Sequence, residues 1–142
     1  MVEDNEGDIL LTTETLAEAN IVTVIKVVND GQKAIDFLMK KGIYTNEELP
    51  GLILLDINLP KKNGHEVLQF IRRTDAFRHI PVFLLTTSSS EKDILQSYKN
   101  QTDSYITKPL EVHDLMNAIL KIETFRIYIT SEPVLPIDYA KR

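Results

Sequence analysis

Asp56 is the residue in this sequence that is best placed to do chemistry. It directly follows the apolar run Leu52–Leu55 and precedes a stretch rich in turn-forming residues, a pattern that is typical of a strand buried on both faces. In open parallel α/β sheets, ligands bind beyond the carboxyl ends of the strands. We therefore expect the Asp56 carboxylate to lie where a ligand would bind.

Other polar residues occupy similar positions along the chain. Glu3 and Asp4 lie close to the chain start, Thr86 ends a second apolar run, and Lys108 follows a third. Taken singly, each is more often a solvated acid, a turn residue or a loop lysine. Because all of them are expected at strand ends on one rim of the same sheet, the sequence predicts a shared site.

A cluster of acids at this rim predicts a cation. Neighbouring strands lie ~4.8 Å apart, so carboxylates at the ends of two adjacent strands face each other. Like charges at that distance raise a pKa or recruit a cation. Mg²⁺ takes one or two carboxylates together with phosphate oxygens. The predicted ligands are the side chains of Glu3, Asp4 and Asp56, with the backbone carbonyl of Asn58.

The remaining residues of the cluster suit a phosphoryl group. Carboxylates are known covalent acceptors of phosphate. The Lys108 ammonium would neutralise phosphoryl oxygens on Asp56, and the Thr86 hydroxyl would donate a hydrogen bond to one of them. The cluster therefore predicts a carboxylate that is phosphorylated with the help of a metal, a lysine and a threonine.

The composition limits the class of protein. A chain of 142 residues fits one compact domain with a short tail, and its net charge of −5 disfavours nonspecific binding to nucleic acid. The absence of cysteine excludes disulfides and thiolate chemistry. No apolar stretch approaches the ~20 residues of a membrane span, and the acidic first residues do not fit a signal peptide. We expect a cytoplasmic protein without nucleic-acid or membrane partners.

Short apolar runs alternate with amphipathic segments along the chain. This alternation favours βαβ units and an α/β fold, in which a doubly wound parallel sheet has helices on both faces. The predicted strands are 22–28, 52–55, 82–85 and 104–107, and the predicted helices are 8–20, a segment from Asp30 to Gly42, a segment capped by Asn63, a segment after Ser88, and 112–120.

The first strand of the predicted sheet is very short. Only Met1 and Val2 precede the Glu3-Asp4 pair, whereas strands average ~5–6 residues. Three explanations are open: residues precede Met1, the chain starts in mid-strand, or the tail segment 127–129 takes the place of the strand. We favour residues upstream of Met1.

Several motifs occur in a fixed order along the chain. They are Val2-Glu3-Asp4-Asn5, Leu54-Leu55-Asp56-Ile57-Asn58-Leu59-Pro60, Asn63-Gly64, Pro81-Val82, Leu85-Thr86-Thr87-Ser88 and Tyr105-Ile106-Thr107-Lys108-Pro109. Together they resemble the receiver domain of two-component response regulators over residues 1 to about 125. The loop 58–64, the long loop 42–51 and the triplet 86–88 are similar to those of stand-alone receivers that partner bacterial and cyanobacterial phytochromes.

The resemblance implies a flavodoxin-like sheet of five parallel strands in the order 2-1-3-4-5, with Asp56 accepting a phosphoryl group from a kinase histidine. It implies that Asp4 binds Mg²⁺ directly, that Glu3 does so directly or through water, and that Asn58 supplies its carbonyl. Such a protein is no ordinary enzyme, but a phosphoacceptor that catalyses its own phosphorylation and dephosphorylation.

The resemblance also implies a switch. Lys108 pairs with Asp56 or its phosphate, Thr86 moves toward the phosphate, and Tyr105 changes rotamer to report the state. The bond between Lys108 and Pro109 is expected to be cis, which is inexpensive before proline.

The tail and the partners follow from the same resemblance. We expect a receiver domain over 1–124 and an arm over 125–142, because phytochrome-associated receivers are similar in using such tails to form homodimers; a disordered tail is the alternative. The expected partners are a sensor histidine kinase of the bacteriophytochrome type and a downstream histidine phosphotransfer protein.

Three other functions are weighed against this one. A haloacid-dehalogenase-type phosphatase resembles Asp-x-Asp after its strand, but the second acid is Asn58 here, which removes the general acid. A flavodoxin-like cofactor binder needs a phosphate loop after the first strand, where Asp4 would repel phosphate. The alternative that stays open is a degenerate receiver, an interaction module without phosphorylation. The short first strand keeps it open, and the intact site argues against it through Glu3, Asp4, Asp56, Thr86 and Lys108.

Overall fold

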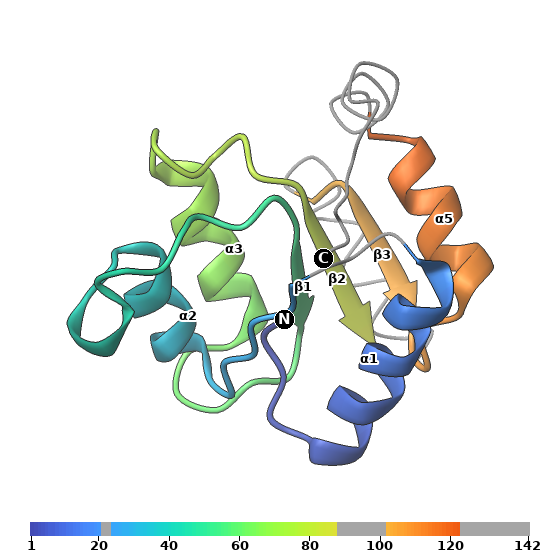
Figure 1. The fold of residues 1–142 in the computed structure, drawn as a ribbon. Coiled ribbons are helices and arrows are strands. Elements are labelled where there is room, and N and C mark those ends of the chain that lie inside the picture. The colour runs from blue at the N-terminus through green and yellow to red at the C-terminus, as the bar shows by residue number, and fades with distance from the viewer. Residues whose placement is uncertain (21–23, 88–101, 123–142) are drawn as a thin grey trace.

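The computed structural model describes residues 1–20, 24–87 and 102–122. Within them a parallel sheet lies between two groups of helices (Figure 1). None of the helices among these residues is both long and apolar enough for a membrane span. The helices are α1 (Glu6–Ala19), α2 (Gly31–Leu38), α3 (Gly64–Arg73) and α5 (Val112–Leu120), with the 3₁₀ helix η1 (Gly42–Tyr44); the strands are β1 (Ile53–Asp56), β2 (Val82–Thr86) and β3 (Ser104–Thr107).

The three strands are parallel and adjacent in the order β1-β2-β3. The register places Asp56 opposite Leu85, and Thr86 opposite Thr107. Two further segments extend the sheet beyond β1, because Val2 forms one parallel bridge to Leu55 and another to Val28. The order of segments in space is therefore 24–28, 1–3, β1, β2 and β3, which agrees with the predicted order 2-1-3-4-5.

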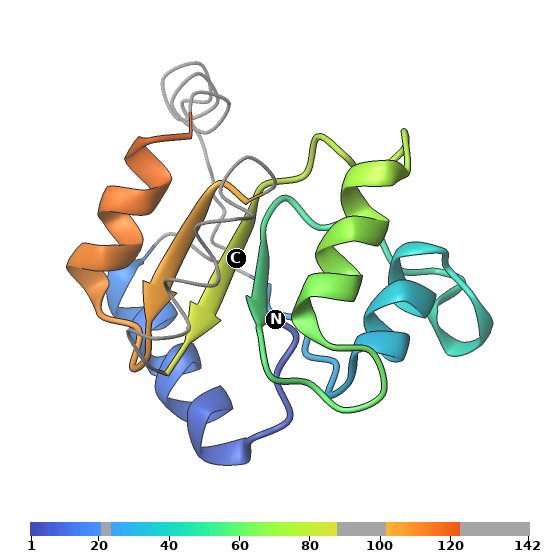
Figure 2. The ribbon, with the colours of Figure 1, turned by 180° about the vertical axis from the view of Figure 1, so that it is seen from behind.

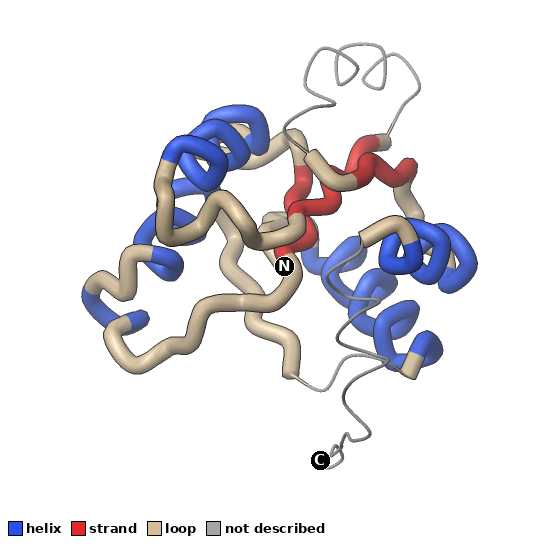
Figure 3. Tube along the Cα trace, turned by 90° about the horizontal axis from the view of Figure 1, so that it is seen from above, coloured by secondary structure: helices blue, strands red, loops and turns tan. Residues whose placement is uncertain are grey.

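The helices cover both faces of the sheet. α2 and α3 contact each other on one face, and α1 and α5 contact each other on the opposite face, as the view from behind and the view from above both show (Figures 2 and 3). Successive strand residues point to opposite faces, so Leu55 and Leu84 join the core beside α3, whereas Leu54 and Phe83 join the core beside α5. This double burial explains why the strands are continuous apolar runs.

The predicted strand 22–28 is wrong for residues 24–27, which are not in a strand. Residue 28 takes part only in the bridge with Val2. The segment that lies between 24–28 and β1 is the short stretch 1–3, in which only Val2 forms a bridge. A longer strand at 24–28 would therefore lack a partner along most of its length. The prediction for residues 21–23, the segment 88–101 and the tail 123–142 lies outside the described residues.

Side-chain caps fix where the helices begin. The Asn5 side chain accepts a hydrogen bond from the backbone N–H of Asp8, so α1 starts directly after the acidic pair. Asp30 caps α2 in the same way, and Asn63 forms the predicted capping box with Glu66 at α3. α2 ends before the predicted boundary at Gly42, since Lys40 adopts a left-handed conformation that stops the helix.

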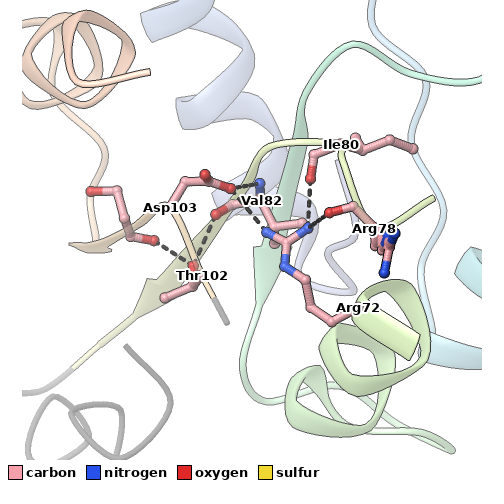
Figure 4. A network of polar contacts seen from close by, with 7 residues as sticks. Arg72, Arg78, Ile80, Val82, Thr102 and Asp103 are labelled. Carbon is pink, nitrogen blue, oxygen red and sulfur yellow. Dashed lines mark hydrogen bonds and ion pairs between the residues drawn. The ribbon is translucent and has the colours of Figure 1, made fainter. Parts of the chain in front are cut away.

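Arg72 forms a network of hydrogen bonds at the end of the sheet opposite the predicted site (Figure 4). Its Nη1 atom donates to the carbonyls of Arg78 and Ile80 at 2.9 and 2.8 Å, and its Nη2 atom donates to Asp103 at 2.9 Å. The same Asp103 oxygen accepts the backbone N–H of Val82 at 2.8 Å. The guanidinium thus joins the last turn of α3 to the segments that precede β2 and β3.

We predict that Arg72→Ala lowers the free energy of unfolding by about 1–3 kcal/mol, because backbone carbonyls and a carboxylate lose a charged donor. Arg73→Ala is the matched control: it removes the neighbouring charge from the same last helical turn, and it should change stability by less than about 0.5 kcal/mol. Urea denaturation measures both variants. Equal losses in the two would show that Arg72 acts only through its charge near the helix end.

Candidate functional site

The predicted acids meet at the carboxyl end of β1. The backbone N–H of Val2 donates to the Leu54 carbonyl at 2.8 Å, and the N–H of Asp56 donates to the Val2 carbonyl at 3.0 Å. These bonds place Glu3 and Asp4 beside Asp56. One carboxylate oxygen from each of the three acids lies within 4.8 Å of the other two. Glu3 and Asp56 are buried, whereas Asp4 is exposed.

Lys108 reaches this cluster from the end of β3. Its backbone N–H donates to the Thr86 carbonyl at 2.7 Å, and the bond between Lys108 and Pro109 is cis, as predicted. The Nζ atom lies 2.8 Å from Glu3 Oε1 and 3.2 Å from Asp56 Oδ2. The ammonium therefore counterbalances two buried acids that come from separate parts of the chain.

The loop after β1 holds the second oxygen of the Asp56 carboxylate. The backbone N–H of Asn58 donates to Asp56 Oδ1 at 3.1 Å. Gly64 lets this loop fold back onto the strand end, since a Cβ atom there would lie 2.6 Å from the Asp56 carbonyl oxygen and 2.7 Å from Ile57 Cα. Both carboxylate oxygens of Asp56 thus have a defined neighbour, the Asn58 N–H for Oδ1 and Lys108 for Oδ2.

The pKa values of the cluster reflect its burial and its charges. Burial and, to a lesser extent, the neighbouring Asp56 raise the pKa of Glu3 and Lys108 lowers it, so that this pKa is about 7. Burial lowers the pKa of Lys108, but its contacts with Glu3 and Asp8 and the charge of Asp56 outweigh burial and raise that pKa above its usual range. The lysine is therefore positively charged at neutral pH.

The residues present fit a hard divalent cation. Glu3, Asp4 and Asp56 supply the oxygen ligands that Mg²⁺ prefers. Glu3 and Asp56 are buried, and both lie beside the single ammonium of Lys108. Together with Asp4 the cluster carries more negative charge than Lys108 compensates, and a divalent cation between the three acids would balance it.

The other two predicted residues come from the neighbouring strands β2 and β3. Thr86 is completely buried at the end of β2, one residue beyond the position that faces Asp56. Tyr105 lies in β3, half-buried against the core beside α2 and α3. Their predicted movements remain predictions.

Sequence reasoning missed Asp8. Its Oδ2 atom accepts a hydrogen bond from Lys108 Nζ at 3.0 Å. The signal that could have found it is the position of α1, which begins directly after Asp4 and Asn5. An acid in the first turn of such a helix lies near the rim that the preceding acids occupy.

We predict that, in the absence of divalent cations, the free energy of unfolding of Glu3→Gln rises relative to that of the wild type as pH increases. The pKa of Glu3 in the folded protein, about 7, exceeds its ordinary value of 4.5, so the folded state binds this proton more tightly than the unfolded chain. Ionisation of Glu3 therefore lowers the free energy of unfolding of the wild type between about pH 4.5 and about pH 7. Glutamine cannot ionise and avoids this loss.

The measurement is urea denaturation of both proteins in EDTA at a series of pH values. The difference in unfolding free energy, variant minus wild type, should rise by about 1–3 kcal/mol across this range and level off above it. A difference that does not change with pH would contradict the raised pKa.

Comparison with known proteins identifies a family. The response regulator receiver domain matches residues 1–120 of this chain. Response regulator Rcp1 of Synechocystis sp. is 39% identical over 133 residues, which are 94% of this chain and 90% of that relative. The probable methanogenesis regulatory protein FilR2 of Methanothrix harundinacea is 37% identical over 126 residues, which are 88% of this chain and 80% of that relative.

Solved structures point the same way. Bacteriophytochrome response regulator RtBRR has a TM-score of 0.80 and 39% identity, over 86% of this chain and 75% of that chain. The phosphorylated cyanobacterial phytochrome response regulator RcpA has a TM-score of 0.70 and 38% identity, over 96% and 95%. The Mn²⁺-bound form of Rcp1 has a TM-score of 0.69 and 39% identity, over 96% of each chain. The predicted α/β fold and the resemblance to phytochrome-associated receivers are confirmed, and this chain belongs to the family of response regulator receiver domains.

Proposed function

We propose that this protein is a response regulator that accepts a phosphoryl group from a kinase histidine on Asp56, in a reaction that needs Mg²⁺. One observation supports this most strongly. The Asp56 carboxylate is buried at a strand end, with one oxygen bound by the Asn58 N–H and the other 3.2 Å from Lys108. Glu3 and Asp4 lie close enough to share a cation with it.

The proposed reaction is a transfer between two acceptors. An Asp56 oxygen forms a bond to phosphorus while the bond from phosphorus to the kinase imidazole nitrogen breaks, and the imidazole keeps that electron pair. Lys108 then pairs with a phosphoryl oxygen in place of the carboxylate. Glu3, Asp4, Asp56 and the Asn58 carbonyl would hold Mg²⁺, which would supply positive charge to neutralise the phosphoryl oxygens. Hydrolysis by water later returns the carboxylate and inorganic phosphate.

The output of this reaction is a change of conformation. Thr86 and Tyr105 are the proposed switch residues, since Thr86 ends β2 beside the backbone of Lys108 and Tyr105 lies in β3, which leads into Lys108. Phosphate favours one arrangement of the two side chains over the other. A nearly complete switch needs a preference of ~5 kcal/mol.

The proposed upstream partner is a sensor histidine kinase of the phytochrome type. The names of similar proteins support it, because RtBRR is a bacteriophytochrome response regulator and RcpA is a cyanobacterial phytochrome response regulator. We further propose a histidine phosphotransfer protein downstream, a cytoplasmic location, and a homodimer formed through residues 125–142, which follow a receiver domain over 1–124. The proposed arm lies outside the described residues.

We predict that incubation with Mg²⁺ and acetyl phosphate adds the mass of one phosphoryl group to the wild type and none to Asp56→Asn, since an amide cannot form the acyl phosphate. Intact-mass spectrometry measures this. Asp75→Asn, which changes an exposed acid outside the cluster, is the control and should be phosphorylated like the wild type. No gain in a folded wild type would favour the degenerate receiver, for which the single bridge at Val2 is the supporting observation.

We predict that Lys108→Ala still binds Mg²⁺ but no longer couples phosphorylation to the switch. The lysine is not among the proposed metal ligands, yet it is the cation that joins the end of β3 to Asp56. Amide NMR spectra with Mg²⁺ and beryllofluoride should show shifts at Thr86 and Tyr105 in the wild type and small shifts in the variant. Wild-type-like shifts in the variant would refute this role of Lys108.

A further inference from the structure

Lys108 also contacts a carboxylate outside the proposed metal site. Among the described residues it has three acidic neighbours, Glu3, Asp8 and Asp56, whose oxygens lie 2.8, 3.0 and 3.2 Å from Nζ. The contact with Asp8 is a hydrogen bond. An ammonium has three N–H donors, so one of them can serve Asp8 while the others face Glu3 and Asp56.

Asp8 differs from the other two acids in its surroundings. It lies in the first turn of α1, its side chain is 33% exposed, and it is not in the group of three acids whose oxygens lie within 4.8 Å of one another. α1 is tied to the segment after β3 at a second point, where the Thr15 hydroxyl donates to the Leu110 carbonyl at 2.9 Å. The helix therefore presents Asp8 to Lys108 from a fixed position.

Lys108 and a divalent cation compete for the same carboxylates. The ammonium lies close to Glu3 and Asp56, and a cation needs both of these acids together with Asp4. Two positive charges a few ångströms apart repel each other, most strongly where water is excluded. A partner that draws the ammonium to the edge of the cluster therefore lowers the cost of binding the cation.

We propose that Asp8 is a positioning residue that holds Lys108 at the edge of the acidic cluster, so that Glu3 and Asp56 can bind the cation. This proposal rests on the proposed function. With the cation bound to Glu3 and Asp56, Asp8 is the acid that keeps the ammonium beside the rim. There the lysine is within reach of a phosphoryl group on Asp56, and it does not occupy the place of the metal.

The test is calorimetric titration of the metal-free protein with MgCl₂. Asp8→Asn keeps the shape of the side chain and removes its charge, and it should raise the Kd for Mg²⁺ by about threefold to tenfold, which lies in the lower part of the range for residues in direct contact. Glu6→Gln is the matched control, because it removes a charge from the same first turn of α1 at an exposed position. It should change the Kd by less than about twofold.

A double-mutant cycle separates positioning from simple electrostatics. If Asp8 acts through the lysine, Asp8→Asn should have no more effect than the Glu6 control when it is introduced into Lys108→Met. Should Lys108→Met not fold, as judged by circular dichroism, Lys108→Gln takes its place, because it lacks the charge and retains a hydrogen-bond donor.

The outcomes are distinct. An equal loss of affinity with and without the lysine would overturn the proposal, since Asp8 would then attract or bind the cation itself. An unchanged Kd in Asp8→Asn would overturn it as well. A wild type that binds no Mg²⁺ would instead refute the metal site of the proposed function.

Discussion

The structure depends on the burial of two carboxylates and one ammonium where three segments of the chain meet. Glu3 follows the short first segment, Asp56 ends β1, and Lys108 follows β3. A buried charge is very costly unless it is paired. Any arrangement that separated Lys108 from the two acids would leave uncompensated charge in the protein interior. The cluster therefore fixes how the ends of the sheet lie relative to each other, although these segments are far apart in sequence.

This arrangement is suited to binding more than to stability. Burial raises the pKa of Glu3 to about 7, which means that the ionised form is held at a cost in free energy. A cation would remove that cost, and ligands that bind only the folded state stabilise it. Functional sites often reduce stability in this way. Here the cost is confined to the carboxyl ends of the strands, and the apolar clusters on both faces of the sheet supply the compensating burial.

The two ends of the sheet differ in their polar contacts. At one end, Arg72 and Asp103 fasten the segments before β2 and β3 through hydrogen bonds to backbone groups. At the other end, polar side chains face one another and a helix begins at each of two adjacent loops, capped by Asn5 and Asn63. Because the hydrogen bonds of Arg72 and Asp103 hold the strands together at their amino ends, the loops at the carboxyl ends can rearrange without separating the strands.

Sequence reasoning was enough to place the strands β1, β2 and β3, the capping box at Asn63, and the acids, threonine and lysine at the strand ends, because each depends on neighbours in the chain. It could not determine the extent of the segment before Val28, since a strand forms only where another segment offers a partner. Nor could it single out Asp8, whose importance rests on a contact with a lysine 100 residues away. The set of acids that the ammonium faces depends on how α1 packs beside α5 and the segment after β3, and no local pattern in the sequence carries that information.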